Sequence, residues 1–166
     1  MVPRLAAGIG IALGCATSSG LAQNPVRFSG ESAGRVARGG HVDARVRATI
    51  DPGWHIYSLT QGRGGPVAMR LTLADSQWFA LRAPATGPVP RVSFDANFHI
   101  DVETYEQDAA FSLPIRVGAR APVGADTIQV RARYQVCNAA MCLPVRVDVV
   151  RVPVTVVTTR TTPPPH

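Results

Sequence analysis

The chain has 166 residues and a formal net charge of +6, and all 17 of its basic residues are arginine. Nucleic acid is a poor explanation for this charge, because the arginines are dispersed on strand-like segments and the chain begins with an export signal. We expect an ordinary solvated surface with a weak preference for acidic partners. About 140 residues follow the signal, enough for one domain with a sizeable core.

Residues 1–22 have the composition of a signal peptide. Arg4 precedes the apolar run 5–13, and small residues lead to a cleavage site expected after Ala22. The run is too short to span a bilayer and no later stretch approaches the necessary length, so we expect a chain that does not span a membrane. Cys15 would leave with the signal. A competing interpretation makes Cys15 the lipidated first residue of a lipoprotein.

The rest of the chain shows the alternation of apolar and polar residues that is typical of half-buried strands. No helical period and no internal repeat is evident. Asp51-Pro52-Gly53 predicts a turn, and the proline-rich passage 84–90 predicts a connection. We expect an all-β antiparallel sandwich over residues 23–157 and a disordered Pro/Thr-rich tail over 158–166. The expected strands cover residues 41–50, 54–59, 67–73, 78–81, 99–105, 110–117, 128–136 and 145–157.

Cys137 and Cys142 flank a four-residue gap between two strand-like runs, which together predict a β-hairpin. Partners in a non-hydrogen-bonded pair approach closely enough for a disulfide. Because side chains on a strand alternate between faces, Cys137 falls in step with Arg133, and Cys142 falls in step with Arg146 and Asp148. We therefore expect both cysteines on the polar face, accessible from outside.

Such a pair is open to two interpretations. Dithiols outside the cytosol oxidise unless something supplies electrons, so a structural disulfide is one of them. A disulfide that closes a ring of only six residues would, however, stabilise the fold by only about 2 kcal/mol. A structural disulfide in the core would also be expected on the apolar face, where it would join distant strands. An accessible pair in a tight loop is better placed for thiol–disulfide exchange.

Other classes of function stay open at this point. Cys137, Met141 and Cys142, with His99, offer soft ligands suited to Cu(I). A non-catalytic binding sandwich with a structural disulfide is a further alternative. Hydrolase chemistry is unsupported, because the chain has no GxSxG, HExxH or Gly-rich phosphate loop. We expect no cofactor and no bound metal.

Three blocks of sequence resemble the N-terminal periplasmic domain of the DsbD thiol:disulfide interchange proteins. They are Gly53-Trp-His-Ile-Tyr57, Phe98-His-Ile-Asp-Val-Glu-Thr-Tyr105, and Tyr134-Gln-Val-Cys137 with Cys142-Leu-Pro144. The blocks occur in the family's order and at similar separations. The resemblance covers most of residues 26–155 and implies an immunoglobulin-like sandwich.

The resemblance also implies roles for five residues. Cys137 and Cys142 match the redox pair, with Cys142 as the cysteine that bonds to partners. Phe98 matches the phenylalanine of the cap loop that covers the pair, although a core phenylalanine is the plain alternative. His55 and Tyr57 fall where the family places aromatic side chains beside the cysteines, and their spacing puts them on one strand face.

Three departures limit this transfer. The gap between the cysteines is four residues, where the best-known members have five. Ala96 and Asn97 replace the acids of the cap loop, and only Asp95 remains nearby. The chain also stops after this domain, without the family's transmembrane electron carrier and C-terminal thioredoxin domain. If the chain is a shuttle, we expect its reductant to be a separate membrane protein.

The resemblance therefore predicts a periplasmic protein-disulfide reductase component, and we expect it to be a monomer. A membrane-embedded thiol reductase would supply electrons to the Cys137/Cys142 pair. The pair would pass them to periplasmic disulfide isomerases or to the thioredoxin-like proteins of cytochrome c biogenesis.

Overall fold

The computed structural model describes residues 24–75, 77–95 and 98–158, and within them it contains twelve strands and no helix. The expected signal peptide and the C-terminal tail from residue 159 lie outside the described residues. The strands are β1 (Val26–Glu31), β2 (Arg35–Ala37), β3 (His41–Ile50), β4 (Trp54–Tyr57), β5 (Arg70–Leu73), β6 (Phe79–Leu81), β7 (Arg91–Asp95), β8 (Ile100–Tyr105), β9 (Ala109–Val117), β10 (Gly124–Tyr134), β11 (Val136–Asn138) and β12 (Arg146–Val157).

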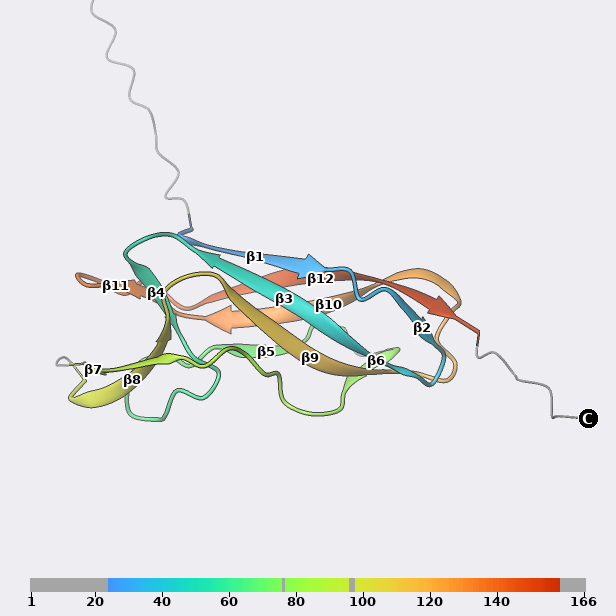
Figure 1. Cartoon of the computed structure of the whole chain (residues 1–166), viewed down its shortest axis with the longest axis horizontal. Coiled ribbons are helices and arrows are strands. Elements are labelled where there is room, and N and C mark those ends of the chain that lie inside the picture. The colour runs from blue at the N-terminus through green and yellow to red at the C-terminus, as the bar shows by residue number, and fades with distance from the viewer. Residues whose placement is uncertain (1–23, 76, 96–97, 159–166) are drawn as a thin grey trace, which may run out of the picture.

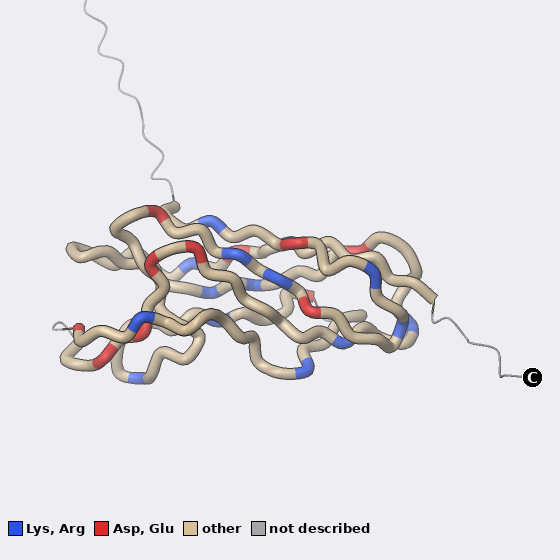
Figure 2. The backbone as a smooth tube through the Cα atoms, viewed as in Figure 1, with Lys and Arg blue, Asp and Glu red and all other residues tan. Residues whose placement is uncertain are grey.

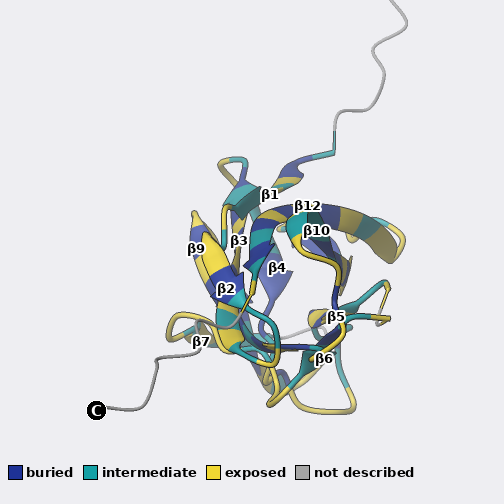
Figure 3. Cartoon of the chain, turned by 90° about the vertical axis from the view of Figure 1, so that its right-hand side faces the viewer, coloured by how far each residue is buried: buried dark blue, intermediate teal, exposed yellow. Residues whose placement is uncertain are grey.

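The strands form three four-stranded sheets. One sheet has the order β1-β3-β9-β6, and the second has the order β2-β12-β10-β5. Seen end-on, the strands of these two sheets surround the core (Figure 3). The third sheet, β11-β4-β8-β7, lies at one end of the long axis (Figure 1). All pairings are antiparallel except that of β12 with the short edge strand β2.

The core is built from the inward residues of the long strands. Alternate residues of β3, β9, β10 and the second half of β12 are buried, as a period of two requires when one face of a sheet is covered. The largest fully buried side chains include Tyr134, Phe111 and Ile128. A second, smaller cluster of Tyr57, Val102 and Cys137 lies in the third sheet. The cysteine region thus has its own packing, separate from the main core.

Most strands agree with the sequence prediction. Strand β3 has the predicted bounds, and the predicted turn after it is closed by a hydrogen bond from the Trp54 N–H to the Asp51 carbonyl. The prediction missed β1, β2 and β7. Strand β2 has only three residues, and β7 exposes Val92 and Phe94, so neither shows a clean buried face.

The predicted faces of the strand after the cysteines are wrong at its start. Val147 and Val149 are 52% and 48% exposed, whereas Asp148 takes an inward register position opposite Ala132. The longer run of alternate valines that follows sets the strand's phase, and those valines are buried. The inward carboxylate of Asp148 has a hydrogen-bond partner, because the Tyr134 hydroxyl donates to it at 2.7 Å.

Tyr134 is fully buried, and its hydroxyl also accepts a hydrogen bond of 2.6 Å from the Asn24 side chain. Its ring meets Phe28 edge-on, with 4.9 Å between centroids. Burial, reinforced by Asp148, raises the pKa of Tyr134 to about 12. This hydroxyl therefore links Asn24, just before β1, to the end of β10 and the start of β12.

We predict that Tyr134→Phe lowers the free energy of unfolding at neutral pH by about 1–2 kcal/mol, because it removes both hydrogen bonds. The deficit should shrink between pH 10 and 12. The folded-state pKa lies above the unfolded value of about 10, so the wild type has the full benefit of the neutral hydroxyl below pH 10 and loses it as the pH approaches 12. Urea unfolding of both proteins at a series of pH values measures this.

The change in the deficit should reach about 2 kcal/mol over the two pH units. Comparison with the variant cancels the titration of the other tyrosines. A deficit that stays constant up to pH 12 would show that Tyr134 has an ordinary pKa.

Candidate functional site

The two cysteines form a disulfide at the tip of the β10–β12 hairpin, with 4.0 Å between their Cα atoms. They face each other as an antiparallel pair. Flanking hydrogen bonds run from the Asn138 N–H to the Met141 carbonyl and from the Leu143 N–H to the Val136 carbonyl, both at 2.9 Å. The cysteines are therefore a non-hydrogen-bonded pair, as the sequence predicts.

The loop between the cysteines is held by one side chain. Asn138 Oδ1 accepts hydrogen bonds of 2.8 Å from the backbone N–H groups of Ala140 and Met141. This is the local bonding that favours asparagine in turns. The four-residue gap thus closes as a defined turn that places Cys142 opposite Cys137.

The cysteines differ sharply in exposure, and this corrects the sequence prediction for one of them. Cys142 is exposed, but Cys137 is only 1% exposed. Parity does place Cys137 on the opposite side from the core residue Val136. That side is covered, because Cys137 packs in the small cluster with Tyr57 and Val102. Alternation within a strand identifies a face, but it does not show what lies on that face.

Strand β4 supplies the aromatic side chains beside the disulfide. Cys137 pairs with His55 in the β11–β4 register, and Tyr57 follows two residues later on the same face. The His55 and Tyr57 rings meet edge-on at 5.2 Å, and His55 Nε2 lies 3.3 Å from the Tyr57 hydroxyl. The structure therefore brings both predicted residues to the cysteines.

Burial sets the protonation of this aromatic pair. It lowers the pKa of His55 below its ordinary value, against smaller opposite effects of Glu106 and Asp95. Burial also raises the pKa of Tyr57, and the nearby Asp95 adds to this. Both side chains are therefore neutral at neutral pH, and no positive charge from His55 stands beside the sulfur atoms.

Phe98 comes to the same site from the β7–β8 turn. It lines a cavity of about 290 Å³ together with His55, Tyr57 and both cysteines, and it is 41% exposed. Its backbone N–H donates to Asp95 Oδ1 at 3.2 Å. The next residue, His99, has a positive φ of 54°, uncommon for a residue other than glycine. Phe98 therefore belongs to the site and not to the main core, while Ala96 and Asn97 lie outside the described residues.

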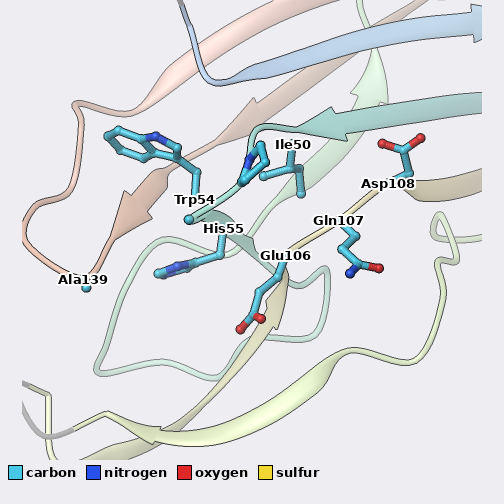
Figure 4. A pocket seen from close by; sticks show the side chains of 9 residues that line it. Ile50, Trp54, His55, Glu106, Gln107, Asp108 and Ala139 are labelled. Atoms are coloured by element: carbon cyan, nitrogen blue, oxygen red, sulfur yellow. The ribbon is translucent and has the colours of Figure 1, made fainter.

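A larger cavity of about 810 Å³ adjoins the site and was not predicted. It shares His55 and Ala139 with the disulfide cavity and extends to Trp54 and to Glu106, Gln107 and Asp108 of the β8–β9 loop (Figure 4). Glu106 also forms an ion pair of 2.9 Å with Arg91. The loop is distant in sequence from both β4 and the cysteines, so no motif in the chain points to it.

A polar network fixes β4 against β8 behind the site. Glu103 accepts hydrogen bonds from the hydroxyls of Ser58, at 2.5 Å, and Thr60. These bonds hold the pKa of Glu103 below its ordinary value. Its backbone N–H donates to Gln61 Oε1 at 2.7 Å, and its carbonyl accepts from the Ser58 N–H at 2.8 Å. The network supports the strand that carries His55 and Tyr57.

The soft ligands considered for Cu(I) come together only in part. Met141 lines the disulfide cavity, but His99 is not among its lining residues. Within the described ranges there is no group of three or more His, Cys, Asp or Glu side chains arranged to hold a metal ion. The same ranges include no helix that is long and apolar enough to cross a membrane.

The family model for the N-terminal domain of the thiol:disulfide interchange protein DsbD matches residues 28–153. The chain belongs to this family. Its sandwich is of the immunoglobulin-like type predicted from the resemblance, and DsbD N-terminal domains are periplasmic domains concerned with thiol–disulfide exchange. A search of curated proteins found no match to the sequence.

Two solved structures of N-terminal domains are similar to the chain. The N-terminal periplasmic domain of ScsB from Proteus mirabilis is 17% identical with a TM-score of 0.51, and the match covers 76% of this chain and 44% of that one. The chain thus spans less than half of the ScsB structure. The reduced N-terminal domain of Neisseria meningitidis DsbD is 15% identical with a TM-score of 0.44, covering 66% and 74% of the two chains.

We predict that Phe98→Ala speeds reduction of the disulfide in this DsbD-type domain by dithiothreitol about three- to tenfold, because the rate of exchange depends on access to the sulfur atoms. Stopped-flow measurement of the oxidised protein with a fixed excess of the thiol gives the rate.

Phe94→Ala is the matched control. Phe94 lies in the neighbouring strand β7 and is 65% exposed, but it does not line the disulfide cavity. Equal rates for the wild type and both variants would show that Phe98 does not limit access to the disulfide.

Proposed function

We propose that this chain is a periplasmic electron carrier that works by thiol–disulfide exchange through Cys137 and Cys142. A membrane-embedded thiol reductase would reduce the pair, and thioredoxin-like or disulfide isomerase proteins would receive the electrons. The observation that carries the proposal is an exposed cysteine bonded to a buried one at a hairpin tip, beside Phe98. Membership of the DsbD N-terminal family supports the same chemistry.

The transfer proceeds in two steps. In the reduced pair, the Cys142 thiolate attacks one sulfur of the partner's disulfide, and the partner's other sulfur leaves as a thiolate that takes up a proton. The Cys137 thiolate then attacks Cys142, which breaks the mixed disulfide and releases the second partner thiol. Two electrons and two protons pass to the partner, and the Cys137–Cys142 bond forms. A dithiol of the membrane reductase reverses these steps to recharge the pair.

The order of the cysteines follows from their exposure. Cys142 is exposed, so a docked partner's sulfur can approach it, but Cys137 is buried in the small cluster with Tyr57 and Val102. Cys137 is nonetheless across the ladder from Cys142, at 4.0 Å between Cα atoms, so it can resolve a mixed disulfide without movement of the strands. Both observations support the proposal that Cys142 is the nucleophile and Cys137 the resolving cysteine.

The surroundings give the thiols little activation before a partner arrives. Reactive cysteines are usually made acidic by a helix N-terminus or a neighbouring cation. Here the aromatic neighbour His55 is neutral at pH 7, since burial lowers its pKa, and the Asp95 carboxylate is close enough to raise the pKa of Tyr57. The proposal therefore gives partner docking, with displacement of Phe98, the main part in controlling the rate.

We also propose the division of the precursor expected from its sequence. Residues 1–22 would be a signal peptide that delivers the domain of residues 23–157 to the periplasm, with residues 158–166 as a tail. Such a carrier could supply electrons to the thioredoxin-like proteins of cytochrome c biogenesis.

We predict that the reduced Cys137→Ala variant accumulates a mixed disulfide with glutathione after treatment with glutathione disulfide, because the resolving thiol is missing. Wild type should return to the intramolecular disulfide with no lasting adduct. Intact mass spectrometry reads the adduct, and peptide mapping places it on Cys142.

Cys142→Ala is the matched control, with the same number of thiols but only the buried one. It should form the adduct at least about tenfold more slowly, since the buried sulfur is hard to reach. Equal adduct formation by the two variants would overturn the assignment of Cys142 as the nucleophile.

The burial of Cys137 also favours the second candidate, a binding sandwich with a structural disulfide. The reduction potential of the folded protein separates the two functions. We expect rapid equilibration with thiol buffers without denaturant, at a potential in the range of about −120 to −270 mV shown by exchange proteins. A potential below about −300 mV with slow reduction would mark a structural disulfide.

A further inference from the structure

The outer face of the β2-β12-β10-β5 sheet carries positive charge only. Its outward register positions hold five exposed arginines and no Asp or Glu. The two carboxylates on these strands, Asp126 and Asp148, occupy inward positions opposite Val154 and Ala132. Figure 2 locates the charged residues along the backbone. The outward arginines, called the arginine face below, are Arg35, Arg70, Arg131, Arg133 and Arg151.

On the opposite sheet, β1-β3-β9-β6, carboxylates lie among the outward arginines. Two outward arginines of β1 and β3 form ion pairs, Arg47 with Glu31 at 3.2 Å and Arg27 with Asp51 at 2.8 Å. Asp43 also lies outward on β3, beside further arginines. Among the described residues, none of the five side chains of the arginine face has an ion pair. The opposite sheet thus carries outward carboxylates among its arginines, whereas the arginine face carries none.

The register brings like charges together on the arginine face. Arg70 and Arg133 are direct cross-strand partners, an arrangement that destabilises a sheet unless something neutralises it. On the other side of β10, Arg133 faces Val147 and Arg131 faces Val149. Both valines are about half exposed. The face is therefore a sheet surface on which guanidinium groups alternate with exposed apolar side chains.

We propose that the arginine face binds the anionic headgroup surface of a phospholipid membrane. Guanidinium groups bond phosphate oxygens in pairs, and anionic lipid attracts basic surfaces that lie within a Debye length. The charges are spread over four strands, and a headgroup layer offers phosphates over that whole area. The valines among the arginines meet the apolar boundary beneath the headgroups, as on other proteins that lie on membranes. An acidic peptide would match only one row of this face.

The disulfide stays free in this arrangement. It joins Cys137 of β11 to Cys142, and β11 lies at one end of the long axis, whereas the strands of the arginine face run along the side of the molecule (Figure 1). Membrane binding would hold the domain at the surface without covering Cys142. The inference does not depend on exchange activity, because the arginine face includes neither cysteine.

Sedimentation with lipid vesicles tests the proposal. The chain beginning at Gln23 is used so that the apolar segment of residues 5–13 does not itself bind lipid. The probes are vesicles of phosphatidylethanolamine with phosphatidylglycerol, and vesicles of phosphatidylcholine alone. We expect binding to the anionic vesicles only, weakened by salt because the charges are exposed.

Two triple variants remove the same charge from opposite faces. R70Q/R131Q/R133Q should lower the partition coefficient onto anionic vesicles about 100-fold at low ionic strength. R45Q/R47Q/R116Q removes three outward arginines from the other sheet and should change it less than about threefold. A double variant, R131Q/R151Q, gives an independent test if the first triple variant fails to fold, and circular dichroism checks all three.

Three outcomes would overturn the proposal. Equal loss in both triple variants would show attraction to net charge with no special face. Equal binding to phosphatidylcholine vesicles would show that the phosphatidylglycerol charge is not recognised. Binding to polyglutamate that depends on the arginine face, without binding to vesicles, would identify an acidic polypeptide as the partner.

Discussion

The disulfide site depends on the point where the β10–β12 hairpin leaves its own sheet. Strand β10 ends at Tyr134, and two residues later the chain pairs with β4 in the third sheet. The buried Tyr134 hydroxyl is hydrogen-bonded to both Asn24 and Asp148, so it holds the end of β10 in the core before the chain enters the third sheet. Because the hairpin tip is shared with another sheet, one cysteine is covered by neighbours from β4 and β8 while the other stays at the surface.

That asymmetry has a chemical consequence that symmetric exposure would not have. Two accessible thiols would exchange with any disulfide they met, and two buried thiols would exchange with none. In the proposed carrier, one exposed cysteine backed by a buried one would receive a partner on a single sulfur and keep the resolving sulfur out of reach of others. Phe98, the neutral His55–Tyr57 pair and the Asp95 carboxylate line the disulfide cavity, and none of them brings a positive charge to the sulfur atoms. Under the proposed function, selectivity would therefore depend on shape and docking more than on thiol acidity.

Strands with a long, regular alternation were predictable from sequence, and β3, β9 and β10 lie within a few residues of their predicted bounds. Where two phases of valine compete, as before Val150 in β12, local alternation predicted the wrong face, because the buried run further along the strand decides. The buried Cys137 was missed for a different reason. Its neighbours Tyr57 and Val102 come from distant strands, and no local pattern encodes the third sheet. The loop of Glu106 to Asp108 escaped prediction in the same way.

The two special surfaces of the domain are separated along its long axis, and that separation follows from the topology. The third sheet closes one end of the sandwich and gathers the sulfur chemistry there, while β10 and β12 run the length of the side and carry the arginine face on their outward positions. The same hairpin thus contributes to both surfaces, since the outward residues of β10 and β12 form part of the arginine face and its tip supplies the cysteines. A ligand on the side face would leave the tip free, because the β-sheet keeps outward arginines and tip cysteines on different parts of one rigid hairpin.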